Sequence, residues 1–97
     1  MFQIEFTNEF YKWLEKLKKK NPGDFRYLYT CIRDLEFEGH RYTRAKSLGD
    51  GLFEIKTHLK YRIYYRFEGD FIILVLDGGD KDTQQRDIRR IKKGSAK

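Results

Sequence analysis

The chain has 97 residues and a mass of 11.8 kDa, the size of one small domain. Hydrophobic residues make up 39% and aromatic residues 16% of it, which excludes an intrinsically disordered chain. The 21 Lys and Arg outnumber the 15 Asp and Glu, giving a formal net charge of +6. A surplus of this sign favours anionic partners such as nucleic acid, anionic lipid or an acidic protein surface, although it is also typical of a solvated face that maintains solubility.

Targeting signals and metal ligands are both sparse in this sequence. The longest apolar run, residues 71–76, is far shorter than the ~18 residues that span a bilayer, and residues 1–10 lack the basic and apolar parts of a signal peptide. The single cysteine, Cys31, lies among apolar residues and is expected to be a buried thiol. The two histidines, His40 and His58, have no acidic residues at metal-ligand spacing. We therefore expect a cytoplasmic protein, without contact to a membrane, that uses neither a metal nor another cofactor.

The first half of the chain predicts a strand followed by a helical hairpin. Residues 1–6 alternate apolar and polar side chains, and Thr7 after them is a candidate helix N-cap. Asn21 and Pro22 restart the helical pattern as an N-cap and a first helical residue, and this second helix is expected to end near Gly39. We expect the hairpin to pack on the sheet through four large apolar side chains: Trp13, Leu17, Phe25 and Ile32.

The second half predicts three strands. Period-2 alternation covers residues 53–58 and 61–67, and residues 71–76 are apolar throughout, as in a central strand. A tight turn is expected at 68–70. The stretch 77–80, whose two glycines resemble turn glycines, is expected to end the sheet.

A basic helix is expected to close the chain, capped by Asp80 or Asp82, with Ile88 and Ile91 on its inner side. The order β-α-α-β-β-β-α predicts an α+β fold, in which a small antiparallel sheet packs against the N-terminal helical hairpin and the C-terminal helix. Residues 1–97 are expected to form one domain, with a flexible tail at about 94–97.

The alternating strands separate a core face of the sheet from a polar face. The core face collects Phe53, Ile55, Ile63, Tyr65 and Phe67, and the polar face collects Glu54, Lys56, His58, Arg62, Tyr64 and Arg66. If the polar face is uncovered, its cations can neutralise phosphates and Tyr64 can stack on a base. The alternative is a ladder of cross-strand ion pairs around Glu54, with Tyr64 as an ordinary sheet residue. The pattern alone favours neither interpretation.

The sequence contains no Gly-x-Ser-x-Gly motif, phosphate-binding loop or dinucleotide fingerprint. RNA cleavage needs less, because the substrate carries its own nucleophile in the 2′-hydroxyl. The protein must orient that group, stabilise the charge on the phosphate and help the 5′-oxygen to leave. Positioned cations can supply part of this chemistry.

Three stretches resemble one family of toxins: KSLGDGLFEIK at 46–56, YRIYY at 61–65 and GGDKDTQQRDI at 78–88. They are similar to the phage-derived addiction module killer branch of the RelE/ParE-type toxins, whose best-known relatives are the HigB toxins. The resemblance extends over nearly the whole chain. It implies a RelE/ParE-like fold and the toxin of a bacterial type II toxin–antitoxin pair.

The activity that the resemblance implies is a metal-independent endoribonuclease, an mRNA interferase that cuts messenger RNA on the ribosome and so inhibits translation. The implied partners are a helix-turn-helix, HigA-like antitoxin, the ribosome and mRNA, with operator DNA contacted only through the antitoxin. Two alternatives stay open. One is a ParE-like toxin that poisons gyrase, and the other is a catalytically inactive relative that only binds its antitoxin.

The resemblance also implies catalytic residues by position. Arg62 matches the strand arginine that contacts the scissile phosphate, and Lys56 matches a basic residue of the preceding strand. Lys81 and Arg86 lie where catalytic residues gather after the final strand. RNA-binding residues are expected on the polar face and in the basic stretch before it: Arg44, Lys46, His58, Tyr64 and Arg66.

Two departures from the family pattern leave the acid–base pair unassigned. Glu54 stands where RelE itself has a lysine, and neither a tyrosine nor a histidine follows Phe71. Lys56, near Arg62, is the first candidate for a general base, with His58 and Tyr64 as alternatives.

Overall fold

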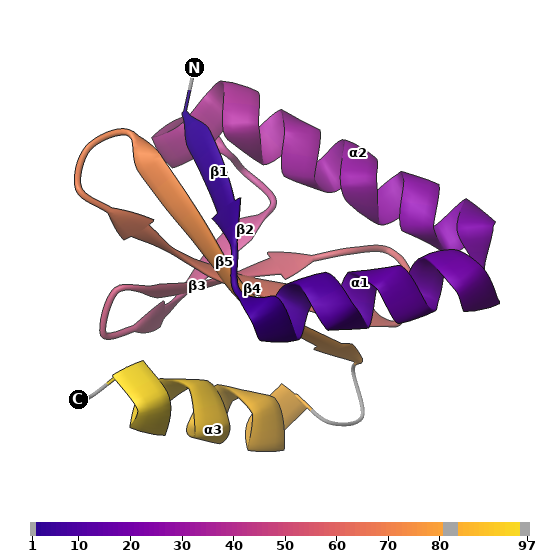
Figure 1. The fold of residues 1–97 in the computed structure, drawn as a ribbon. Coiled ribbons are helices and arrows are strands. Elements are labelled where there is room, and N and C mark those ends of the chain that lie inside the picture. The colour runs from indigo at the N-terminus through magenta and orange to yellow at the C-terminus, as the bar shows by residue number, and fades with distance from the viewer. Residues whose placement is uncertain (1, 81–83, 96–97) are drawn as a thin grey trace.

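The computed structural model describes residues 2–80 and 84–95 (Figure 1). They form an α+β fold, as the sequence predicts. The elements, in chain order, are β1 (Gln3–Phe6), α1 (Asn8–Lys20), α2 (Pro22–Glu38), the short 3-10 helix η1 (Gly39–Arg41), β2 (Ala45–Gly49), β3 (Leu52–Lys56), β4 (Tyr61–Glu68), β5 (Ile72–Asp80) and α3 (Gln84–Ser95).

The two helix starts of the hairpin lie where the capping residues predict them. The Thr7 hydroxyl accepts a hydrogen bond from the Phe10 amide at 3.1 Å, and the Asn21 side chain accepts one from the Asp24 amide at 3.2 Å. Each side chain satisfies an amide that has no partner within its own helix. Because Pro22 lacks an amide hydrogen, it fits the first turn of α2, and the chain reverses within a single residue between α1 and α2.

The sheet has five strands in the order β1-β5-β4-β3-β2, which corrects the sequence prediction in two respects. β2 was not predicted, since its sequence AKSLG carries too few apolar residues to show alternation, yet it pairs antiparallel with β3 as an edge strand. β1 pairs with β5 in parallel, so the sheet is mixed and not antiparallel throughout. Alternation identifies a strand without giving the direction of its neighbour.

The glycines at 78 and 79 do not end the sheet, contrary to the sequence prediction. β5 continues through them to Asp80 and pairs with β4. A Cβ atom on Gly78 would lie 2.6 Å from Cε3 of Trp13, closer than real Cβ contacts allow. Gly78 therefore allows the Trp13 ring of α1 to pack directly on the backbone of β5.

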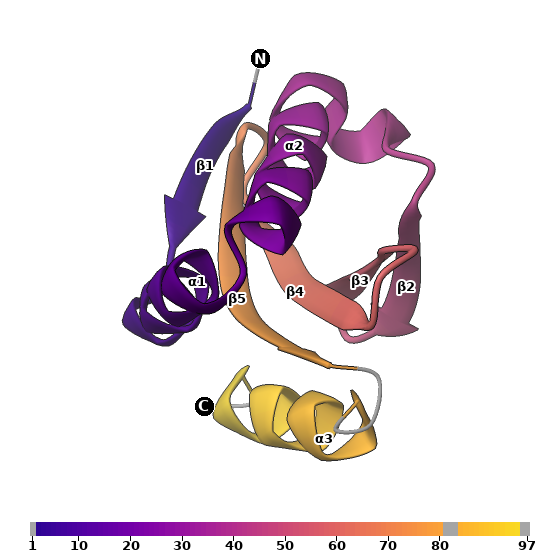
Figure 2. The ribbon, with the colours of Figure 1, turned by 90° about the vertical axis from the view of Figure 1, so that its right-hand side faces the viewer.

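Both faces of the sheet are covered (Figure 2). α1 and α2 cover one face with the main core, which includes Phe10, Leu14, Leu17, Leu28, Ile32 and Leu35 from the helices and Ile55, Ile63, Tyr65, Ile73 and Val75 from the strands. Of the four predicted packing residues, Leu17 and Ile32 are buried, and Trp13 and Phe25 are partly buried against the same core. Cys31 is a buried free thiol, as predicted. The predicted interface between the hairpin and the sheet is thus confirmed.

α3 covers part of the opposite face with a second, smaller cluster. Ile91 of α3 and Tyr64 of β4 are buried in it, and Ile88 packs against it, as the spacing of the two isoleucines predicts. α3 extends through Ser95, so residues 94 and 95 of the expected tail belong to a helix. Residues 96–97 and the possible cap Asp82 lie outside the described residues, and Asp80, the other candidate cap, belongs to β5. None of the described helices is long and apolar enough to cross a bilayer.

Candidate nucleic-acid interface

A groove with a volume of about 540 Å³ lies where β2 begins and β3 ends. It brings together four of the predicted site residues: Arg44, Lys46, Lys56 and His58. The backbone between them is fixed, because the Lys56 amide donates to the Arg44 carbonyl at 3.2 Å. The side chains of these four residues are exposed, so their charges are available to a ligand. Thr43, Ala45 and Thr57 complete the lining.

Tyr27 of α2 supports one wall of the groove. Its hydroxyl accepts hydrogen bonds from Nη1 of Arg44 at 3.0 Å and from the His58 amide at 3.4 Å. Its ring meets the His58 imidazole edge to face, with 4.2 Å between the ring centroids. The Tyr27 hydroxyl also raises the pKa of Arg44, a guanidinium that is charged at neutral pH in any case. Sequence reasoning missed Tyr27, because its place in an apolar-striped helix made it indistinguishable from a core residue.

Among the described residues that line the groove there are three cations and one imidazole but no carboxylate. Three cations within one hollow can bind the phosphates of a single-stranded nucleic acid. The exposed imidazole of His58 beside them carries one ring nitrogen that can accept a hydrogen bond and one that can donate. The arrangement therefore suits a phosphodiester ligand.

Arg62 lies directly across the sheet from Lys56 but is mostly buried, with 13% of its side chain exposed. Its Nη1 donates to the Tyr61 carbonyl at 3.0 Å, and its Nε lies 3.9 Å from Oε1 of Glu54, too far for a hydrogen bond. The Glu54 side chain is fully buried, and its other oxygen accepts a hydrogen bond of 2.5 Å from Gln84 at the start of α3. The ion pair that the ladder interpretation expects is thus present.

The buried cluster formed by Glu54, Arg62 and Tyr64 contains three polar atoms that make no hydrogen bond within the described part of the chain. They are Oε1 of Glu54, Nε of Arg62 and the hydroxyl of Tyr64. The prediction that Tyr64 stacks on a base is wrong for this structure, because α3 covers it completely. Burial also raises the pKa of the Tyr64 hydroxyl, which therefore stays protonated and is not available as a general base.

The remaining predicted residues do not join the groove. Arg66, further along β4, is paired with Glu68 at 2.7 Å on the exposed end of the strand. Arg86 is exposed on the first turn of α3. Lys81 lies outside the described residues. Within residues 2–80 and 84–95, no group of three or more His, Cys, Asp or Glu side chains could hold a metal ion.

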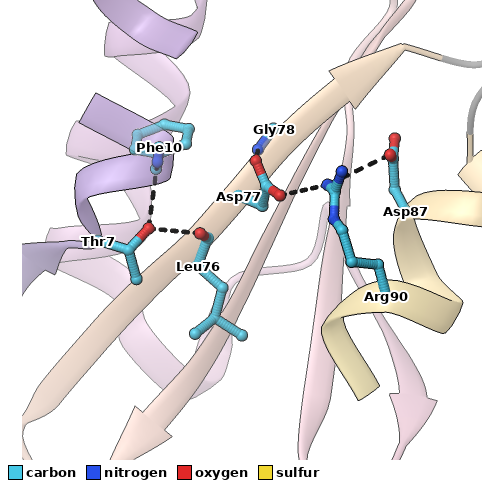
Figure 3. A network of polar contacts seen from close by, with 7 residues as sticks. All are labelled: Thr7, Phe10, Leu76, Asp77, Gly78, Asp87 and Arg90. Carbon is cyan, nitrogen blue, oxygen red and sulfur yellow. Dashed lines mark hydrogen bonds and ion pairs between the residues drawn. The ribbon is translucent and has the colours of Figure 1, made fainter. Parts of the chain in front are cut away.

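Polar contacts hold both α3 and the start of α1 against β5 (Figure 3). Arg90 of α3 pairs with Asp77 of β5 and, at 3.3 Å, with Asp87 one turn earlier. Asp77 also accepts a hydrogen bond of 2.8 Å from the Gly78 amide, and burial raises the pKa of its carboxyl. Beside it, the Thr7 hydroxyl donates to the Leu76 carbonyl at 2.5 Å. The ion pair between Arg90 and Asp77 thus fixes α3, the helix that covers Tyr64, on β5.

Comparison with known proteins identifies the family of this chain. A model of the phage-derived, Gp49-like proteins matches residues 12–96, which include the groove, the buried cluster and α3. The chain belongs to this family. A relative is an uncharacterized protein of Haemophilus influenzae, 35% identical over 92 residues, with 93% of this chain and 89% of the relative covered. The two proteins thus align over almost their entire lengths.

Proposed function

We propose that this Gp49-like protein is the toxin of a bacterial type II toxin–antitoxin pair, of the HigB-like branch of the RelE/ParE superfamily, and that it cuts messenger RNA on the ribosome. The main observation behind this proposal is that one groove is lined by Arg44, Lys46, Lys56 and His58. The chain's net charge of +6 and the resemblance of its three sequence stretches support it. The cut would inhibit translation without a metal ion or another cofactor.

In the proposed reaction, the 2′-oxygen of the RNA forms a bond to phosphorus and the bond to the 5′-oxygen breaks. The products are a 2′,3′-cyclic phosphate and a 5′-hydroxyl. His58, the imidazole that lines the groove, takes the proton from the 2′-hydroxyl, and a water molecule gives a proton to the leaving 5′-oxygen. Lys56 and Arg44 bind the phosphate oxygens, where negative charge builds up in the transition state. Tyr27 positions the guanidinium of Arg44 for this task.

The proposed partners follow from the same charge distribution. A helix-turn-helix antitoxin with an acidic segment would neutralise the toxin by covering the groove cations, and operator DNA would be contacted only through that antitoxin. Association of such opposite charges is fast and slows as salt screens them. An association rate that is independent of salt would instead place the antitoxin on an uncharged surface.

A translation reaction with purified toxin tests the proposal. The native protein should truncate the messages, His58→Ala should slow cutting by about 100-fold or more, and Lys56→Ala should slow it more mildly. Lys19→Ala is the matched control, because Lys19 is exposed on α1 outside the groove, and it should cut at the native rate. Intact messages in the presence of folded native toxin would refute the nuclease proposal. Trapped cleaved DNA in a gyrase assay would identify a gyrase poison instead.

A further inference from the structure

A second hollow, with a volume of about 440 Å³, lies between the C-terminal half of α1 and the adjoining ends of β4 and β5. We call it the α1 pocket. Figure 1 shows α1 crossing this end of the sheet. The pocket is lined by Trp13, Lys16, Leu17, Lys20, Asn21, Lys60, Tyr61, Gly79 and Asp80. Its size falls within the range of ~300–1,000 Å³ that is usual for small-molecule sites.

Positive charge dominates the α1 pocket. Lys16 and Lys20 are one helical turn apart on α1, and Lys60 reaches the pocket from the loop between β3 and β4. Asp80 is the one acidic residue among the described residues of the lining, so the three ammonium groups there exceed its carboxylate by two charges. The pocket therefore attracts an anion.

The wall of the pocket is aromatic and firmly held. Trp13 and Tyr61 meet edge to face, with ring centroids 5.9 Å apart. The Tyr61 hydroxyl donates to Asp24 at 2.8 Å, and the Trp13 ring is packed against the backbone of Gly78. The Lys60 ammonium lies 5.5 Å from the centre of the Tyr61 ring. Cations beside fixed aromatic rings are the combination that binds phosphates together with bases.

The α1 pocket and the groove lie on either side of one short loop. His58 of that loop lines the groove, and Lys60, two residues later, lines the pocket. A strand bound in the groove could thus place a further nucleotide in the pocket. We propose that the α1 pocket binds a nucleoside phosphate, either as a free nucleotide or as one nucleotide of an RNA strand. This proposal does not depend on whether the protein cuts RNA.

The protein carries its own reporter for this site, because Trp13 is the single tryptophan of the chain. Titration of the full chain with AMP or ATP at low salt should change the Trp13 fluorescence in a saturable way, whereas adenosine, which lacks phosphate, should not. Lys20→Ala and Lys60→Ala should each weaken binding by about two- to fivefold, as expected for the loss of one exposed charge contact. Lys19→Ala, on α1 outside both the groove and the pocket, should leave the binding unchanged.

A short RNA in place of the free nucleotides distinguishes the two sources. A response to RNA alone, weakened by Lys20→Ala, assigns the pocket to a nucleotide within the strand. No response to either ligand, an effect of Lys19→Ala equal to that of Lys20→Ala, or an equal response to polyglutamate would overturn the proposal. The message-cutting assay of the groove variants tests the proposed nuclease independently, so a negative result in the fluorescence titration would refute only the proposal for the α1 pocket.

Discussion

Replacing Arg62 by alanine should destabilise the fold, because it leaves a carboxylate buried beside no cation. Glu54 is fully buried, and the Arg62 Nε is 3.9 Å from its Oε1. Removing one partner of a buried ion pair costs ~3–5 kcal/mol. The Gln84 hydrogen bond to the other Glu54 oxygen remains in the variant, so the lower end, about 3 kcal/mol, is expected. In a domain of this size that lowers the melting temperature by about 12–24 °C.

The double variant Glu54→Gln, Arg62→Ala separates stability from function. A neutral amide at 54 removes the buried charge that the single variant leaves unpaired, so the double variant should regain at least half of the lost free energy of unfolding. Urea unfolding, followed by the Trp13 fluorescence, measures both values. If Arg62 also contacts the phosphate, the double variant should be stable and still fail to cut messages. An Arg62→Ala protein that unfolds at the native urea concentration would refute the buried-pair argument.

Three further changes test other contacts. Tyr64→Phe should leave the free energy of unfolding unchanged or raise it by up to ~1 kcal/mol, because the lost hydroxyl makes no hydrogen bond within the described residues. A destabilised variant would show that the Tyr64 hydroxyl has a hydrogen-bond partner. Gly78→Ala should lower the free energy of unfolding by ~1–3 kcal/mol, because the new Cβ would clash with Trp13. Gly23→Ala is the control, since its Cβ would meet only one atom, at 3.7 Å, and should not destabilise the protein. Equal urea midpoints for the two variants would contradict the packing of Trp13 on Gly78. Because burial raises the pKa of Asp77, the folded protein binds that proton more tightly than the unfolded chain does. The stability of the native protein relative to Asp77→Asn should therefore rise as the pH falls from above the folded pKa to below the ordinary value of 3.8, and a flat difference would refute it.

Local signals predicted the helical half of the fold well. Thr7 and Asn21 are capping residues whose effect needs only the next three residues, so sequence alone places both helix starts. The glycines at 78 and 79 show the opposite case. Their role depends on Trp13, which is distant in sequence, so the same dipeptide was interpreted as a turn. The parallel pairing of β1 with β5 likewise joins strands at opposite ends of the chain.

The sequence predicted which residues share the polar face of the sheet, but not which of them are buried there. Alternation placed Lys56, Arg62 and Tyr64 on one face of the sheet, and the register of β3 and β4 agrees with this. What the pattern could not give is the element that covers the face. α3 has only two apolar residues facing the sheet, Ile88 and Ile91, yet with the Arg90 ion pairs they suffice to bury Tyr64.

The cover formed by α3 divides the predicted site into two parts with different physical properties. Lys56 and His58 are exposed and line a groove to which no described residue of α3 contributes, so water and a ligand can reach them. Arg62 and Glu54 lie beneath α3, where the lower effective dielectric strengthens their interaction and makes each unpaired atom costly. Binding of a phosphodiester can therefore begin at the open groove without any change in the fold. A direct contact from Arg62 to phosphate would replace its long contact with Glu54, and the carboxylate would then need a proton or another donor. The loss of cutting in a stable double variant would show that the strand arginine contributes to the chemistry from beneath this cover.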